Sequence, residues 1–126
     1  MSWALLAAVG KVESDHGRSA APGVHAGLNR AGCCAGPMQF NLTDGPPSTW
    51  DTYRRPGDDV YDPADAIPAA ARKLCAGGLA GPARPDPCPQ LAGPARVHAA
   101  VFAYNHDCAY VDGVQRQTAT YQGGRR

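Results

Sequence analysis

Apolar side chains recur at helical spacing along this 126-residue chain, and no segment alternates apolar and polar residues as a half-buried strand does. The longest stretch without helical spacing, from Arg18 to Thr49, is rich in Gly, Pro and Asn and is typical of loops. The fold class predicted from this pattern is all-α, mainly helical, with a minor β-hairpin allowed in the loop region. We expect a single domain over residues 1–121 and a linker or disordered tail over residues 122–126.

The predicted helices carry start and stop signals and apolar faces. The signals are the N-cap candidates Ser2, Ser48 and Asp62, the stops at Gly17 and Gly77-Gly78, and the helix-opening prolines Pro63 and Pro94. The last helix is predicted over about residues 109–121. The residues expected on inward faces include Trp3, Leu5, Leu6, Val9, Val12, Ala66, Ile67, Ala70, Leu74, Val97, Val101, Val111, Val114 and Tyr121.

Large aliphatic side chains are scarce, because Leu, Val, Ile and Phe together number 18 whereas Ala numbers 23. This composition favours helices that pack closely through small side chains. The formal net charge of +1 argues against a nucleic-acid binder that works by neutralising phosphates, so no nucleic-acid partner is expected. No apolar run approaches the roughly 20 residues of a membrane-spanning helix, so no membrane span is expected either.

Five cysteines are a high number for this length. No C-x-x-C pair occurs and the four histidines lack zinc-ligand spacing, so we predict no metal site and no cofactor. Disulfides are the better interpretation, and they indicate an oxidising compartment. Cys75 and Cys88 would close a loop of about 14 residues, worth on the order of 3 kcal/mol in the chain-entropy estimate. One of Cys33 and Cys34 could join Cys108, which would leave one cysteine over.

The acidic residues include ten Asp but a single Glu, Glu13. Helical spacing places Glu13 in the last turns of the first helix, on or beside the face that carries Trp3 and Leu6. A carboxyl there is partly desolvated, which favours its protonated form near neutral pH and suits it to act as a general acid. Asp15 is the nearest second acid, but residues i and i+2 face different sides of a helix, so it is a poor partner for an in-line reaction.

Six short segments occur in an order that resembles a known enzyme family. They are Lys11–Arg18 (KVESDHGR), Gly36–Phe40 (GPMQF), Pro47–Trp50 (PSTW), Tyr61–Ile67 (YDPADAI), Ala103–His106 (AYNH) and Tyr110–Val111. In these segments the chain resembles the soluble lytic transglycosylases with a lysozyme-like fold, of the kind found in high-GC Gram-positive bacteria. The resemblance spans about residues 3–121. It departs from the family's pattern at Asn41–Pro46, where relatives usually have a couple of residues.

The resemblance implies an enzyme that cleaves the β-1,4 bond between N-acetylmuramic acid and N-acetylglucosamine in peptidoglycan. Glu13 would be the sole acid and base, and the muramic-acid 6-hydroxyl would close a 1,6-anhydro ring. Attack by water instead would make the chain a lysozyme-type hydrolase. The implied partner is the glycan strand of peptidoglycan, and the implied location is extracellular or in the cell wall. We expect a monomer.

The resemblance also implies roles near the catalytic acid. Ser14 would hydrogen-bond the N-acetyl group of the substrate or Glu13 itself. Gln39 would orient the Glu13 carboxyl or the sugar. Met38 and Phe40 would line either the substrate groove or the core.

The second half of the chain would complete the substrate site. Tyr104 would place its hydroxyl near the catalytic acid, Asn105 would contact substrate or hold the backbone of the following turn, and Tyr110 would stack on a sugar ring or pack. If the second segment and the Ala-Tyr-Asn segment are neighbours, as the family implies, a bridge between Cys34 and Cys108 is sterically plausible.

Two interpretations from other classes compete with this one. A cysteine peptidase could use Cys34 as nucleophile with His98 or His106 as base, although the chain lacks strands for a papain-like site. A non-catalytic glycan-binding module could keep the groove alone, although the placement of Glu13 argues against it.

Overall fold

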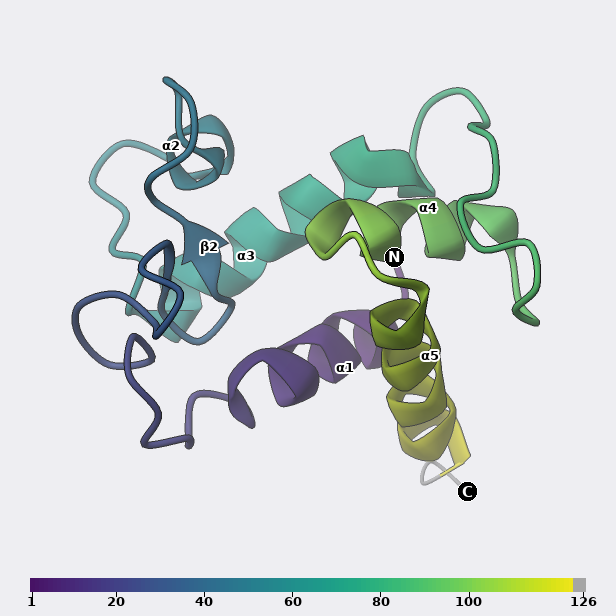
Figure 1. Cartoon of the computed structure of the whole chain (residues 1–126), viewed down its shortest axis with the longest axis horizontal. Helices are drawn as coiled ribbons and strands as arrows, with labels where there is room; N and C mark the ends of the chain where they lie inside the picture. Colours follow the sequence, from purple (N-terminus) through teal and green to yellow (C-terminus); the bar gives the residue numbers. More distant parts are fainter. Residues whose placement is uncertain (124–126) are drawn as a thin grey trace. The chain divides into compact units, whose positions relative to one another are not determined.

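The computed structural model describes residues 1–123, and Figure 1 shows their elements in chain order. Helices supply nearly all of the regular structure, and a two-stranded antiparallel sheet lies in the predicted loop region, so the expectation of a mainly helical chain with a minor hairpin is confirmed. The elements are α1 (Trp3–Ser14), β1 (Cys34–Ala35), β2 (Phe40–Asn41), α2 (Thr49–Tyr53), α3 (Pro63–Leu74), the π-helical turn η1 (Cys75–Leu79), α4 (Ala95–Tyr104) and α5 (Cys108–Gly123).

The described residues group into two compact units. One comprises Val9–Ala70, and the other comprises Met1–Ala8 and the chain from Ala71 onward. Helix α5 includes Gln122 and Gly123, which the sequence assigned to a linker, whereas residues 124–126 of that predicted tail lie outside the described residues. Within residues 1–123, no helix is both long and apolar enough to cross a membrane.

The unit of residues 9–70 is built around the hairpin. Ala35 of β1 pairs with Phe40 of β2, and α2 lies against β2 (Figure 1). Phe40 is completely buried, with its ring centroid 5.0 Å from that of Trp50 on α2. The hairpin turn requires glycine at position 36, because Gly36 has φ +82° and a side chain there would overlap the carbonyl of Val60.

The other unit contains a close helix contact between η1 and α4 (Figure 1). A Cβ added to Gly78 would lie 2.9 Å from Cβ of Ala99, and one added to Gly77 would lie 3.2 Å from Cβ of Ala103. Gly78 also has φ +154°, which side chains rarely adopt. The packing through small residues that the composition predicted is confirmed at this contact.

The predicted start signals at two helices are confirmed, whereas one stop signal acts differently. Ser48 and Asp62 each accept a backbone N–H from the first turn of the helix that follows them. The α-helix itself ends at Leu74, just before the predicted Gly77-Gly78 stop, and η1 follows it to Leu79 with Gly78 outside helical φ/ψ. Glycine without a Cβ permits both the wider turn and the close approach of α4.

The predicted inward faces are partly wrong. Trp3, Val12 and Ile67 are 50%, 43% and 40% exposed, whereas Ala4 and Ala8 of α1 are fully buried. Periodicity weights large apolar residues, whereas most of the buried apolar side chains of α1 and α3 are alanines. The buried side of α1 is therefore rotated towards its alanines.

The predicted disulfide pairings are wrong. Cys88 is bonded to Cys108, Cys33 is bonded to its neighbour Cys34, and Cys75 is the free cysteine. This excludes both a Cys75–Cys88 bridge and a Cys34–Cys108 bridge in this structure. The segment after η1 passes the first residue of α5, where the Cα atoms of Cys88 and Cys108 are 5.7 Å apart, an ordinary disulfide separation. Spacing along the chain carries no information on that approach.

Candidate functional site

Glu13 lies in the last turn of α1 and is partly exposed. Gly10 is one turn earlier on the same face, and a Cβ added to it would lie 3.5 Å from Sδ of Met38. A Cβ added to Gly17, just beyond the helix, would lie 3.4 Å from Cβ of Pro37. The end of α1 therefore lies against the Gly36–Phe40 turn, so the structure brings the first two family-like segments together within one unit.

Ser14 joins these two segments directly. Its side chain is 3% exposed, and its hydroxyl donates to the carbonyl oxygen of Pro37 at 2.6 Å. The hydroxyl oxygen of Ser14 also accepts the N–H of Gly17 at 2.7 Å, which satisfies a backbone group beyond the helix end. Because the hydroxyl proton is used by Pro37, the predicted bond from Ser14 to substrate would have to use its remaining lone pair.

Gln39 is held in the hairpin turn by its backbone and its side chain. Its φ of +50° lies in the left-handed region, which residues other than Gly seldom adopt and which often marks functional sites. Its amide Nε2 donates to the carbonyl of Gly36 at 2.8 Å, and its Oε1 accepts from Nδ2 of Asn29 at 3.2 Å. Sequence reasoning missed Asn29, whose position in a Gly-rich loop was its one signal.

Met38 and Phe40 lie in the core of this unit. They are 2% and 0% exposed, and Phe40 stacks at a tilt on Trp50. Of the two positions that the resemblance allowed for them, the core is the one that they occupy in this structure, and from there they support the turn that carries Gln39.

Asp15 forms ion pairs with two cationic side chains. Its Oδ1 accepts from Nζ of Lys11 at 2.6 Å and from the guanidinium of Arg18 at 2.9 Å. The hydrogen bonds from Arg18 and then Lys11 hold the pKa of Asp15 well below its usual range. Asp15 is therefore an ionised surface carboxylate whose side chain is engaged within its own segment.

The remaining predicted site residues belong to the other unit. Tyr104 ends α4 and its ring lies 4.1 Å from Nζ of Lys73, a cation–π contact. Asn105 is exposed, and its backbone N–H donates to the carbonyl of Val101 and so closes α4. Tyr110 is partly exposed in the first turn of α5.

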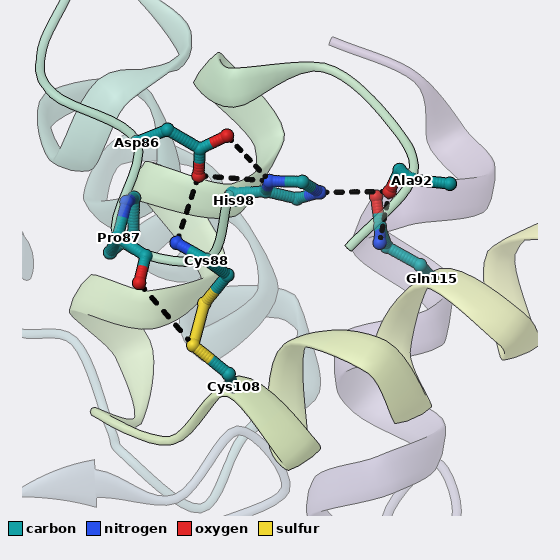
Figure 2. Close-up of polar contacts among 7 residues, drawn as sticks. All are labelled: Asp86, Pro87, Cys88, Ala92, His98, Cys108 and Gln115. Carbon is teal, nitrogen blue, oxygen red and sulfur yellow. Dashed lines mark hydrogen bonds and ion pairs between the residues drawn. A yellow bond between two sulfur atoms is a disulfide. The ribbon is translucent and has the colours of Figure 1, made fainter. Parts of the chain in front are cut away.

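A second polar cluster surrounds His98 of α4 (Figure 2). His98 is 0% exposed. Its Nδ1 lies 3.0 and 3.1 Å from the carboxylate oxygens of Asp86, and its Nε2 lies 2.9 Å from the carbonyl of Ala92. Gln115 of α5 donates to the same carbonyl at 3.0 Å. The ring thus joins α4 to the preceding loop at two points, and neither nitrogen is left for proton transfer with a substrate.

The Cys88–Cys108 disulfide extends this cluster to α5 (Figure 2). The backbone N–H of Cys88 donates to Asp86 at 2.9 Å, and Sγ of Cys108 lies 3.4 Å from the carbonyl of Pro87. The disulfide and the Asp86–His98 pair therefore bind one loop to both helices. This arrangement is a structural staple.

Acid should weaken the staple through Asp86. The N–H of Cys88 and then the His98 ring lower the pKa of Asp86, against burial, which raises it. A folded-state pKa below the unfolded value of about 3.9 contributes stability above that value and loses it as pH falls through the folded pKa. Urea unfolding from pH 6 to pH 2 should show Asp86→Asn less stable than wild type at pH 6, with the difference shrinking below about pH 4. Parallel curves over the whole range would contradict this assignment.

Two other kinds of site find no support among residues 1–123. No group of three or more His, Cys, Asp or Glu side chains within that part of the chain could hold a metal ion. The sulfur of Cys34 is bonded to Cys33, so a peptidase nucleophile at Cys34 has no thiolate in this oxidised state. Comparison of the chain with family models, with curated proteins and with solved structures finds no match.

Proposed function

We propose that this chain is a peptidoglycan-cleaving lytic transglycosylase with a lysozyme-like fold and with Glu13 as its acid and base. The observation that carries the proposal is the 2.6 Å hydrogen bond from Ser14 to Pro37. It fixes the helix end that bears the only glutamate of the chain onto the turn of the Gly-Pro-Met-Gln-Phe segment. These are the two segments that carry most of the family resemblance.

The reaction proceeds in two proton transfers through Glu13. The protonated carboxyl first gives its proton to the glycosidic oxygen as the bond to C1 of muramic acid breaks, and the N-acetyl oxygen of the same sugar stabilises C1. The resulting carboxylate then takes the proton of the 6-hydroxyl, whose oxygen bonds to C1 and closes the anhydro ring. No second carboxylate is required, which is compatible with Asp15 being held in ion pairs by Lys11 and Arg18.

The proposed setting is the cell wall or the extracellular space, with peptidoglycan strands as the partner and a monomer as the active form. The Cys88–Cys108 disulfide supports an oxidising compartment. In this proposal Gln39 orients the carboxyl or the sugar, and Tyr104, Asn105 and Tyr110 contact the glycan strand from the second half of the chain.

Digestion of purified peptidoglycan, followed by mass spectrometry of the soluble products, tests the proposal. We expect muropeptides that end in 1,6-anhydro-muramic acid, 18 mass units lighter than the hydrolysis products because no water is added. Reducing-end muramic acid would assign the chain as a lysozyme-type hydrolase instead. Binding of glycan without either product would assign it as a glycan-binding module.

A further inference from the structure

We propose that the Cys33–Cys34 disulfide is a redox-sensitive positioning element for Gln39. The closed disulfide holds the Gln39 side chain in the turn that contacts the Glu13 helix end, and its reduction releases that side chain. The effect on glycan cleavage rests on the proposed function, whereas the effect on Gln39 does not.

A single side chain connects the disulfide to the turn. The backbone N–H groups of Cys33 and Cys34 both donate to Oδ1 of Asn29, at 3.2 and 3.3 Å. The N–H of Asn29 in turn donates to the carbonyl of Cys34 at 2.8 Å. A disulfide between adjacent residues closes a small ring around their shared peptide bond. The ring restricts the backbone torsions that aim both N–H groups at one oxygen.

The other end of the Asn29 amide reaches Gln39. Nδ2 of Asn29 donates to Oε1 of Gln39 at 3.2 Å, and Nε2 of Gln39 donates to Gly36 at 2.8 Å. The carbonyl of Pro37, inside the same turn, accepts the hydroxyl of Ser14. The orientation of Asn29 therefore sets the orientation of Gln39 in the turn to which the end of α1 is fixed.

Reduction of the ring is a two-electron step. A dithiol reductant supplies two electrons and two protons, the S–S bond of Cys33 and Cys34 becomes two thiols, and the reductant becomes a disulfide. Both residues are partly exposed, so a reductant can reach them, whereas Cys88 of the other disulfide is completely buried. The open chain no longer holds both N–H groups on Asn29, which frees the Asn29–Gln39 hydrogen bond. Gln39 is then held where thiols oxidise and released where they stay reduced.

Two variants separate the steps of this mechanism. Cys33→Ser/Cys34→Ser reproduces the open chain without any reductant. Asn29→Asp keeps the acceptor for the cysteine N–H groups and removes the donor to Gln39, so it breaks the connection with the disulfide intact. Cys75→Ser, which changes the free cysteine, is the matched control and should retain the wild-type response to a dithiol.

NMR measurement of hydrogen exchange at the Gln39 side-chain amide tests the proposal without an activity assay, with mass spectrometry after alkylation to report which disulfides are open. We expect exchange about fivefold faster in both variants and in wild type whose Cys33–Cys34 bond is reduced, because the Nε2 bond to Gly36 opens more often once Oε1 has lost its donor, Asn29. A fivefold change is the equivalent of about 1 kcal/mol, or one neutral hydrogen bond. Reoxidation of wild type should reverse the change. An unchanged Gln39 amide after the bond opens, in wild type or in the double serine variant, overturns the proposal.

Peptidoglycan digestion gives the second readout. Reduced wild type and both variants should cleave about fivefold more slowly than oxidised wild type, and the variants should no longer respond to a dithiol. If the rate of cleavage is unchanged although the Gln39 side chain is released, the disulfide does not regulate activity and that part of the proposal is overturned. If oxidised wild type cleaves no peptidoglycan, the proposed function fails. The exchange rates of the Gln39 amide then still show whether the Cys33–Cys34 disulfide positions that side chain.

Discussion

Glu13→Gln is expected to abolish cleavage of peptidoglycan, lowering the rate by at least about 100-fold. The amide keeps the size of the side chain but can neither donate a proton to the leaving oxygen nor accept one from the 6-hydroxyl. General acid–base groups contribute about 100- to 10,000-fold, and here one residue serves both steps, so the upper part of that range is expected. The measurement is the rate of release of soluble muropeptides from purified peptidoglycan.

Asp15→Asn is the matched control for this variant. Asp15 is two residues from Glu13, and its substitution also replaces a carboxylate with an amide. Its carboxylate, however, is held by Lys11 and Arg18. We expect its rate to stay within about threefold of wild type, because the ionised Asp15 carboxylate has no proton to donate and is engaged by cations of its own segment. Undiminished cleavage by Glu13→Gln, with circular dichroism showing a folded protein, would exclude the proposed mechanism. A large loss in Asp15→Asn alone would make Asp15 the second catalytic acid.

Removal of the Cys88–Cys108 disulfide is expected to produce the largest loss of stability. The two cysteines are 20 residues apart, and opening a loop of that size lowers the free energy of unfolding by about 3 kcal/mol in the chain-entropy estimate. For a chain of this size the melting temperature should fall by about 12 °C. Urea denaturation of Cys88→Ala/Cys108→Ala measures the loss.

Cys75→Ala is the control, because Cys75 forms no disulfide in this structure. It should lower the free energy of unfolding by less than about 1 kcal/mol. Equal losses in the control and in the double variant would mean that the staple of Figure 2 contributes little through its disulfide. In that case the loop would be held mainly by the contacts of His98 with Asp86 and with the carbonyl of Ala92.

Local signals were sufficient to predict the helices and several of their ends. Ser48 and Asp62 cap the helices that they precede, because a short side chain that accepts a hydrogen bond satisfies nearby N–H groups without help from the rest of the fold. For the loop region of residues 18–49 the sequence allows a minor hairpin but does not locate its strands. The inward faces could be predicted less well, since Trp3 and Ile67 are exposed whereas the neighbouring alanines Ala4 and Ala66 are buried.

The candidate site divides in the same way. The sequence singled out Glu13, the only glutamate, and the Gly-Pro-Met-Gln-Phe segment, but not the Ser14–Pro37 hydrogen bond that joins them. It also missed Asn29, because an asparagine in a loop has many available partners. The contacts of Asn29 with Gln39 and with the two cysteines exist only after the hairpin forms.

The sequence by itself determined the helical class, the capped helix ends and the single glutamate near the end of α1, since each depends on residue types a few positions apart. Only the tertiary structure decided which cysteines pair, which helix faces are buried and which partner His98 finds in Asp86. These depend on where distant segments meet. Apolar burial, which is non-directional, drives that meeting but does not specify its partners in advance.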